Sequence, residues 1–253
     1  MTAEPAGHGV RRLCIAFDLE RYSAGTDAAQ IEKQRAMAGM VREACDRGAL
    51  ERAHWLRQEQ GDGELALLPP GIDEARVITS LWREFREGLH RYNRHANPAA
   101  RLRMRVAVHE GVAYIADNGF AGTAINTVCR LRDCHAAKDA LSGTDGDLVL
   151  IASDRIYRDV ICGFDTLDLP AAAFTETAID MPDKAFRATA YIFSGVATQP
   201  GSPPGTPSAQ DTPIHGSDTS DSGSGRGSIF IGPNADIRDV VSGVVNHYNE
   251  NRR

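Results

Sequence analysis

The sequence predicts an α+β fold with a mixed sheet, built from residues 11–196. Apolar stretches with the two-residue period of a strand interleave with longer stretches at helical spacing. A Gly-Asp-Gly turn at residues 61–63 joins two of the strands as a tight hairpin. Hydrophobic residues make up 42% of the 253 residues, which is enough for a sizeable core. Hairpins among interleaved strands and helices are typical of an α+β domain.

The first half of this stretch predicts three strands and two helices. Residues 13–17 (LCIAF) form a short apolar strand that ends at Asp18. Residues 27–47 form a helix, and residues 55–68 form two strands around the Gly-Asp-Gly turn. From Asp73 onward, apolar residues at helical spacing predict a strongly amphipathic helix: Val77, Ile78, Leu81, Trp82, Phe85, Leu89 and Tyr92.

The second half predicts three strands and two helices. Residues 102–108 alternate as a half-buried strand, and residues 123–135 form a helix. Residues 148–151 form a strand, after which Ser153 caps a helix that runs to Ile161. Residues 184–193 close the domain as its last strand.

Outside this domain the composition changes sharply. Residues 1–10 are predicted to be a flexible N-terminus, and residues 197–227 a disordered linker of Gly, Pro, Ser, Thr and Asp. Such a linker has almost no large apolar residue to bury against its chain entropy. Residues 228–253 are predicted to be a short interaction segment that binds a signalling partner or self-associates. Its SIFIG stretch favours stacked strands, whereas residues 236–248 fit an amphipathic helix equally well.

The charge balance excludes several classes of partner. The chain has 28 Lys and Arg against 34 Asp and Glu, a net charge of -6, so we expect no nonspecific binding of nucleic acid or anionic membrane. No apolar run approaches the roughly 20 residues of a membrane span, and the start lacks an apolar signal core. Five scattered cysteines are expected to be reduced core residues of a cytoplasmic protein: Cys14, Cys45, Cys129, Cys134 and Cys162.

Two acidic residues stand where chemistry is expected. Asp18 follows the first strand, and Asp62 lies in the Gly-Asp-Gly turn. Together they could hold one divalent cation, since Mg²⁺ prefers one or two carboxylates plus substrate phosphates. Taken singly, each is equally a common cap or turn residue. The phosphate-loop pattern GxxxxGK(S/T) is absent from the sequence, which removes the kinase and ATPase classes that need it.

A second polar pair lies on the helix predicted at residues 123–135. Asn126 and Arg130 are four residues apart and share one helix face. That face is distinct from the apolar stripe formed by Ala124, Val128 and Leu131. The planar guanidinium of Arg130 could hold a phosphate and stabilise charge that develops during transfer, and Asn126 could orient a sugar oxygen. The alternative is a solvated polar face.

The order of these features resembles a known family. The patches FDLERYS, QGDGELAL, RMRVAVHEG, GTAINTVCRLRD and LVLIASDRIYRDV together resemble the catalytic domain of class III nucleotidyl (adenylate/guanylate) cyclases. More narrowly, they resemble the cyclase-like domains of actinobacteria. The resemblance covers residues 12–195 and implies the ferredoxin-like βαββαβ cyclase fold.

The resemblance implies a homodimer with active sites in the clefts between two subunits. It implies cyclisation of a nucleoside triphosphate to a 3′,5′-cyclic nucleotide and pyrophosphate with two Mg²⁺ or Mn²⁺ ions, in bacterial signalling or defence. It matches six residues to roles: Asp18, Asp62 and the Leu19 carbonyl to metal binding, Asn126 to the ribose, Arg130 to the phosphates and Lys184 to the triphosphate.

The sequence departs from the family at three positions. Arg21 stands where a glycine usually lets backbone amides approach phosphate, so it either crowds the loop or adds a charge. Leu56 and Gly119 stand at the positions we match to the purine-reading Lys and Asp or Thr. Trp55 and Arg57 flank Leu56 and are candidates for contacting a different base, although filling the core is the favoured role for Trp55. Cyclic UMP or cyclic CMP therefore stays open as a product.

Two functions remain open at this stage. The matched aspartates, Asn126 and Arg130 favour an active cyclase. Arg21 and the missing purine-reading pair favour a catalytically inactive cyclase-fold module that binds nucleotide or partner proteins.

Overall fold

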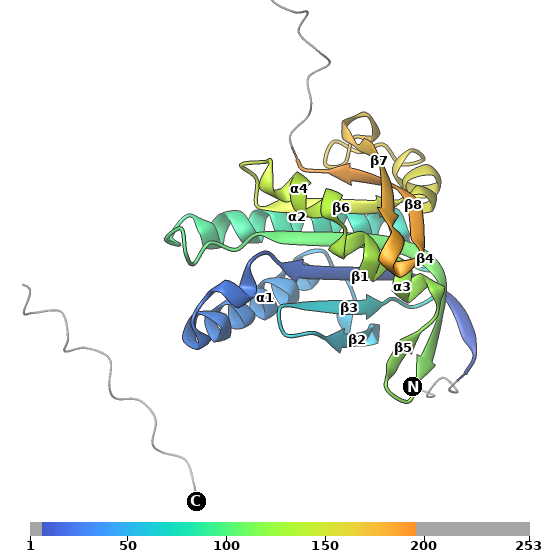
Figure 1. Ribbon diagram of the computed structural model, residues 1–253, viewed down its shortest axis with the longest axis horizontal. Helices are drawn as coiled ribbons and strands as arrows, with labels where there is room; N and C mark the ends of the chain where they lie inside the picture. The colour runs from blue at the N-terminus through green and yellow to red at the C-terminus, as the bar shows by residue number, and fades with distance from the viewer. Residues whose placement is uncertain (1–6, 196–253) are drawn as a thin grey trace, which may run out of the picture. The chain divides into compact units, whose positions relative to one another are not determined.

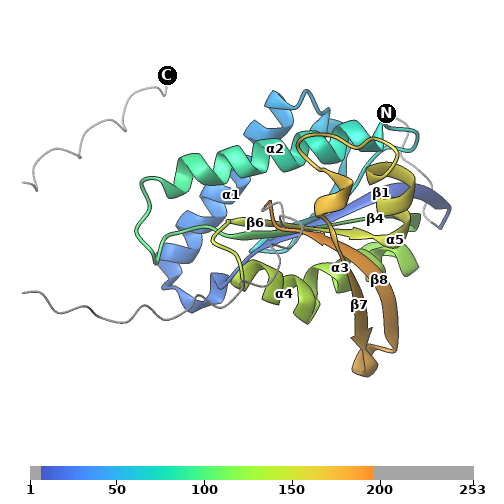
Figure 2. The same ribbon diagram turned by 90° about the horizontal axis from the view of Figure 1, so that it is seen from above.

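The computed structural model describes residues 7–195, which form an eight-stranded sheet with helices on both faces (Figures 1 and 2). The strands are β1 (Gly9–Leu19), β2 (Leu56–Glu59), β3 (Gly63–Leu67), β4 (Met104–Ala116), β5 (Gly119–Ala121), β6 (Leu148–Ser153), β7 (Thr175–Met181) and β8 (Phe186–Phe193). Their order is β2-β3-β1-β4-β6-β8-β7, with β5 paired to β4. Only the β4–β6 pair among them is parallel, so the predicted α+β class with a mixed sheet is confirmed.

The helices form the two outer layers. They are α1 (Asp27–Arg47), α2 (Glu74–Asn93), α3 (Thr123–Asp133), α4 (His135–Ser142) and the short α5 (Asp154–Ile156), which continues as the π-helical turn η3 (Tyr157–Ile161). The 3₁₀ turns are η1 (Tyr22–Ala24), η2 (Arg52–His54), η4 (Ala171–Ala173) and η5 (Pro182–Lys184). Helices α1 and α2 cover one face of the sheet, and α3 and α4 cover the other (Figure 2).

Strand β1 lies between both layers. Leu13, Ile15 and Phe17 belong to the core shared with α1 and α2, whereas Cys14 and Ala16 belong to the core shared with α3. A strand that is covered on both faces needs apolar residues at successive positions. This explains why residues 13–17 are an unbroken apolar run.

Helix α1 begins and ends as predicted, and α2 begins as predicted, because local signals fix these ends. The Thr26 hydroxyl accepts from the amide of Ala29 at the start of α1, and the helix ends before Gly48. The Asp73 carboxylate accepts from the amide of Arg76 at the start of α2. These are N-cap interactions that satisfy amides without a partner inside the helix.

Other elements differ from the prediction. The helix predicted at residues 123–135 is broken at Cys134, whose backbone is extended, and continues as the unpredicted α4. Strand β7 was also missed, because only Ile179 of its residues is buried and the strand therefore has a weak apolar signal. The three-residue β5 is too short to leave a pattern. Strand β1 begins at Gly9, inside the stretch predicted to be flexible.

The five cysteines, predicted to be core residues, are not all in the core. Cys14, Cys45 and Cys134 are buried, whereas Cys129 is half-buried and Cys162 is exposed. Burial raises the pKa of the Cys14 thiol to about 12 and that of Cys45 to about 11, so both stay protonated near neutral pH.

Several sequence predictions lie outside the described residues. These are the linker at 197–227 and the interaction segment at 228–253, which stay predictions. Within residues 7–195, no helix combines the length and the apolar character needed to cross a membrane.

Candidate functional site

Pairing of β1 with β3 brings Asp18 and Asp62 together. Asp18 stands opposite Gly63 in the strand register, so Asp62 is the next residue along. The amide of Leu19 donates to the Asp62 carbonyl oxygen at 2.9 Å. The approach depends on Gly63, because a Cβ atom there would lie 2.1 Å from the Phe17 carbonyl oxygen. Two residues far apart in the sequence thus become neighbours at the end of β1.

We expect Gly63→Ala to destabilise the protein by about 3 kcal/mol, because the added methyl group forces β1 and β3 apart. Urea unfolding measures the change. Gly39→Ala is the matched control, since a Cβ atom at this position in α1 meets only the Arg42 side chain, at 4.0 Å. We expect the control to be neutral or stabilising by up to about 1 kcal/mol. Equal losses in both variants would contradict the close approach at Gly63.

The Asp18 carboxylate has an internal counter-ion. Its two oxygens accept from Nε and Nη2 of Arg105, at 3.0 and 2.5 Å. The two residues are cross-strand partners on β1 and β4, and both are buried. Burial raises the pKa of Asp18, and the charge and hydrogen bonds of Arg105 oppose that rise. The guanidinium therefore favours the ionised carboxylate that metal binding requires.

The end of α3 is fastened to the turn that carries Asp62. Arg132 forms an ion pair with Asp133 at 2.8 Å and donates to the Gln60 side chain at 2.7 Å. The charge of Arg132 also lowers the pKa of Asp18, although by less than Arg105 does, and the charge of Asp133 raises it. Asp18 thus lies on the α3 face of the sheet, among charges that are already paired.

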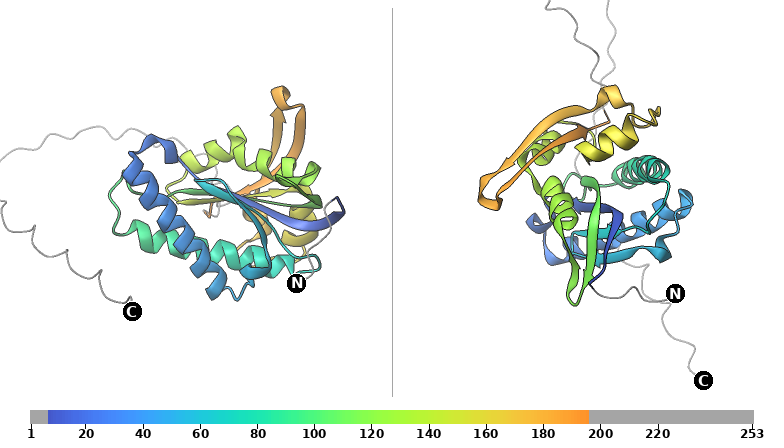
Figure 3. Two further views of the ribbon diagram at one scale, coloured as in Figure 1. Left: turned by 90° about the horizontal axis from the view of Figure 1, so that it is seen from below. Right: turned by 90° about the vertical axis from the view of Figure 1, so that its right-hand side faces the viewer.

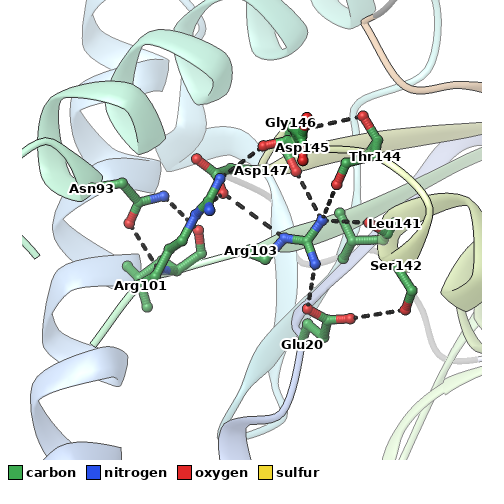
Figure 4. Close-up of polar contacts among 11 residues, drawn as sticks. Glu20, Asn93, Arg101, Arg103, Leu141, Ser142, Thr144, Asp145, Gly146 and Asp147 are labelled. Carbon is green, nitrogen blue, oxygen red and sulfur yellow. Dashed lines mark hydrogen bonds and ion pairs between the residues drawn. The ribbon is translucent and has the colours of Figure 1, made fainter. Parts of the chain in front are cut away.

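The segment that follows Asp18 is fixed by Arg103, as Figure 4 shows. Nη1 of Arg103 donates to the Glu20 carboxylate at 3.1 Å, and the Glu20 amide donates to the Arg103 carbonyl at 2.8 Å. The hydroxyl of Ser142 also donates to Glu20, at 3.4 Å. Nη2 of Arg103 donates to three carbonyl oxygens at the end of α4 and in the loop before β6: Leu141, Thr144 and Gly146. One side chain thus joins the end of β1 to the α4–β6 loop.

The donor set at the end of β1 fits a hard divalent cation. Asp18 and Asp62 supply carboxylates, and Leu19 between β1 and the loop supplies a backbone carbonyl, which are the ligands that Mg²⁺ prefers. Each Asp18 oxygen has a second lone pair that Arg105 does not use. No group of three or more His, Cys, Asp or Glu side chains in residues 7–195 is arranged to hold a metal. An ion here would take its remaining ligands from water or from substrate phosphates.

The polar pair on α3, Asn126 and Arg130, faces away from the aspartates. Asn126 is exposed and Arg130 is half-buried, with its guanidinium 5.2 Å from the centre of the Phe186 ring on β8. Residues two apart on a helix point to opposite sides. Arg132 contacts the β2–β3 turn, so Arg130 points away from it. Within one chain, the structure therefore does not bring Asn126 and Arg130 to the aspartates.

Lys184 lies beside the polar pair rather than beside the aspartates. It is exposed in η5, the turn of the β7–β8 hairpin, two residues before the Phe186 ring that Arg130 covers. Figures 2 and 3 show this hairpin extending away from the sheet. The six matched residues thus form two groups in one chain, one around Asp18 and one around Arg130.

Near the base-reading positions matched in the sequence, the structure places a further polar side chain. Leu56 packs against the core beneath α3, so it presents no group to a ligand. Gly119 has a φ of +101°, and a Cβ atom there would lie 2.7 Å from Oε1 of Gln58. The exposed amide of Gln58 thus occupies the space beside Gly119, on the same face of β2 as Leu56. Sequence reasoning missed Gln58, although strand alternation places it two residues from Leu56.

Trp55 and Arg57 are not beside Gly119. Trp55 is 8% exposed and belongs to the core, with the Arg52 guanidinium 5.9 Å from its ring centre. Arg57 alternates with Leu56 and Gln58 and lines a cleft of about 650 Å³ between α1 and the β2–β3 hairpin. That cleft also contains the buried ion pair of Arg52 and Glu64, at 2.7 Å. These positions favour packing over base contact for Trp55.

No protein-family model and no curated protein matches the sequence. Solved structures match the fold. The guanylyl cyclase Cya2 is 14% identical, with 77% of this chain and 96% of that chain covered and a TM-score of 0.53. An adenylate/guanylate cyclase/hydrolase from Silicibacter pomeroyi is 16% identical, with 74% and 98% covered and a TM-score of 0.50. A bacterial light-regulated adenylyl cyclase is 12% identical, with 78% of this chain and 56% of that chain covered and a TM-score of 0.51.

These likenesses define the class of fold. The described domain has the nucleotidyl cyclase fold of class III adenylate/guanylate cyclase catalytic domains, as the ordered sequence motifs predict. The narrower actinobacterial group stays a prediction.

Proposed function

We propose that this protein converts a nucleoside triphosphate into a 3′,5′-cyclic nucleotide and pyrophosphate. The observation that carries the proposal is that Asp18 and Asp62 are neighbours at the end of β1, which the close approach at Gly63 makes possible. The cyclase fold supports the same activity. Nucleotide signalling or defence in bacteria is the biological setting we propose.

The aspartate group would act on the triphosphate. Two divalent ions, Mg²⁺ or Mn²⁺, held by Asp18, Asp62 and the Leu19 carbonyl, would neutralise the triphosphate and lower the pKa of the ribose 3′-hydroxyl. The 3′-hydroxyl would lose its proton to water, and its oxygen would bond to the α-phosphorus while the bond to the pyrophosphate oxygen breaks, so that pyrophosphate leaves with that electron pair. Arg105 holds the Asp18 carboxylate in one orientation throughout.

The second group of residues would come from another copy of the chain. Asn126 and Arg130 face away from the aspartates of their own chain, so a complete site requires a homodimer in which each subunit supplies one group. Asn126 would orient the ribose, and the planar fork of Arg130 would bind the phosphates as charge builds on them. Lys184, at the same hairpin as Phe186, would contact the triphosphate.

Gln58 is the polar side chain best placed to contact the base. Its amide lies beside Gly119, whose φ of +101° disfavours any residue with a side chain. A carboxamide both donates and accepts hydrogen bonds, so it can pair with the edge of an amino or a keto base. The geometry therefore supports base contact by Gln58 without fixing the base, and a pyrimidine substrate stays within the proposal.

The experiment is an assay of the full chain with each of the four ribonucleoside triphosphates and Mn²⁺. We expect one of them to give a cyclic product and pyrophosphate in equal amounts. Absence of product from all four, in a preparation that is dimeric, would contradict the proposal. Nucleotide binding without product would instead support the catalytically inactive module.

A further inference from the structure

Arg21 holds a backbone conformation that side chains rarely adopt. Its φ and ψ are 53° and 33°, in the left-handed region that favours glycine. Among residues 7–195, only Ala49 and Ala185 share a positive φ without being glycine. Such strain persists only where neighbouring contacts fix the chain, and it gathers at functional sites.

The neighbours of Arg21 fix it from both sides. The Glu20 carboxylate is held by the Arg103 guanidinium, as Figure 4 shows, and the Glu20 amide donates to the Arg103 carbonyl. On the other side, Tyr22 packs against the core, and the amide of Ala24 donates to the Arg21 carbonyl at 3.3 Å. The loop therefore presents the side chain at residue 21 from a rigid base, three residues after Asp18.

Arg21, three residues after Asp18, differs in its contacts from Arg105 and Arg132. Arg105 binds Asp18, and Arg132 binds Asp133 and Gln60. Arg21 is exposed, and within the part of the chain that the structure describes its side chain has no hydrogen bond or ion pair. It is thus a free positive charge on the loop that follows Asp18.

We propose that Arg21 binds the phosphates beyond the α-phosphate of the nucleoside triphosphate. The inference rests on the proposed function. A triphosphate brings several negative charges toward two carboxylates, and a free guanidinium offers a planar pair of donors that matches phosphate oxygens. Arg21 would therefore raise the affinity for nucleoside triphosphates but not for monophosphates.

The test compares Arg21→Gly with Ala49→Gly. Both substitutions relieve a left-handed backbone at an exposed position, but Ala49 lies at the opposite end of α1. The ligands are the α,β-methylene analogue of the triphosphate that the assay identifies, which cannot be cyclised, and the matching monophosphate. Titration calorimetry gives their Kd values, and calorimetric melting gives the Tm of each variant.

We expect Arg21→Gly to raise the Kd of the triphosphate analogue about tenfold or more, because one charge-assisted contact is lost. We expect its monophosphate Kd to stay within about twofold, and its Tm to rise by about 2 °C, as in Ala49→Gly. Arg21→Lys, which keeps the charge, should recover part of the affinity. If the wild type binds the analogue and Arg21→Gly binds it equally well, the proposed role of Arg21 is overturned while the proposed function stands. A wild type that binds no nucleotide would overturn the proposed function as well.

Discussion

Asp62→Asn is expected to lower cyclic-nucleotide formation at least about 100-fold while changing the free energy of unfolding by less than about 0.5 kcal/mol. The Asp62 carboxylate is half-buried and forms no hydrogen bond or ion pair with residues 7–195, so the fold does not depend on its charge. Product formation and urea unfolding of the same preparation measure both effects.

Asp18→Asn should lose the same turnover but also about 3 kcal/mol of stability, because Arg105 is left buried without a full counter-charge. The matched control is the double variant Asp18→Asn with Arg105→Met, which removes both charges. It should regain stability and remain inactive. Turnover near that of the wild type in either single variant would show that the aspartates do not bind the reacting group.

Mixing two inactive variants should restore activity if each site is built from two subunits. Asp62→Asn lacks the aspartate group and Arg130→Ala lacks the opposite group, so one of the two sites in their heterodimer is intact. After subunit exchange in an equimolar mixture, we expect about a quarter of the wild-type turnover. Cyclic product measured against the mixing ratio checks this result.

The control for this experiment is a mixture of Asp62→Asn with Asp18→Asn. Both substitutions damage the aspartate group, so neither site of the heterodimer is complete and no turnover should appear. If the first mixture also stays inactive, although size measurements show that subunits have exchanged, the site is not shared between chains in the proposed way.

Features set by nearby residues could be predicted from the sequence. The ends of α1 and α2 follow from caps and apolar spacing within a few residues. The polar face with Asn126 and Arg130, separate from the buried stripe, follows from helix geometry alone. Strand β7 and helix α4 could not be found in this way, because β7 is an exposed edge and α4 depends on a break at Cys134.

Features set by strand register were harder to predict. The approach of Asp18 to Asp62 was expected from their positions at strand ends, but its cause, the contact at Gly63, depends on how β1 meets β3. The pairing of Asp18 with Arg105 depends on the register of β1 with β4, which a single sequence does not specify. The spacing from Asp62 indicates Leu56 as the base-reading position, whereas the structure places Gln58 beside Gly119.

Because Arg105 neutralises the buried Asp18 carboxylate through two hydrogen bonds, folding does not require a bound metal ion. A carboxylate kept in the interior by a resident guanidinium needs no bound ion to be tolerated there. Under the proposed function, a newly synthesised chain would therefore fold when divalent cations are scarce and bind them afterwards, so that ion availability would control its output rather than its stability.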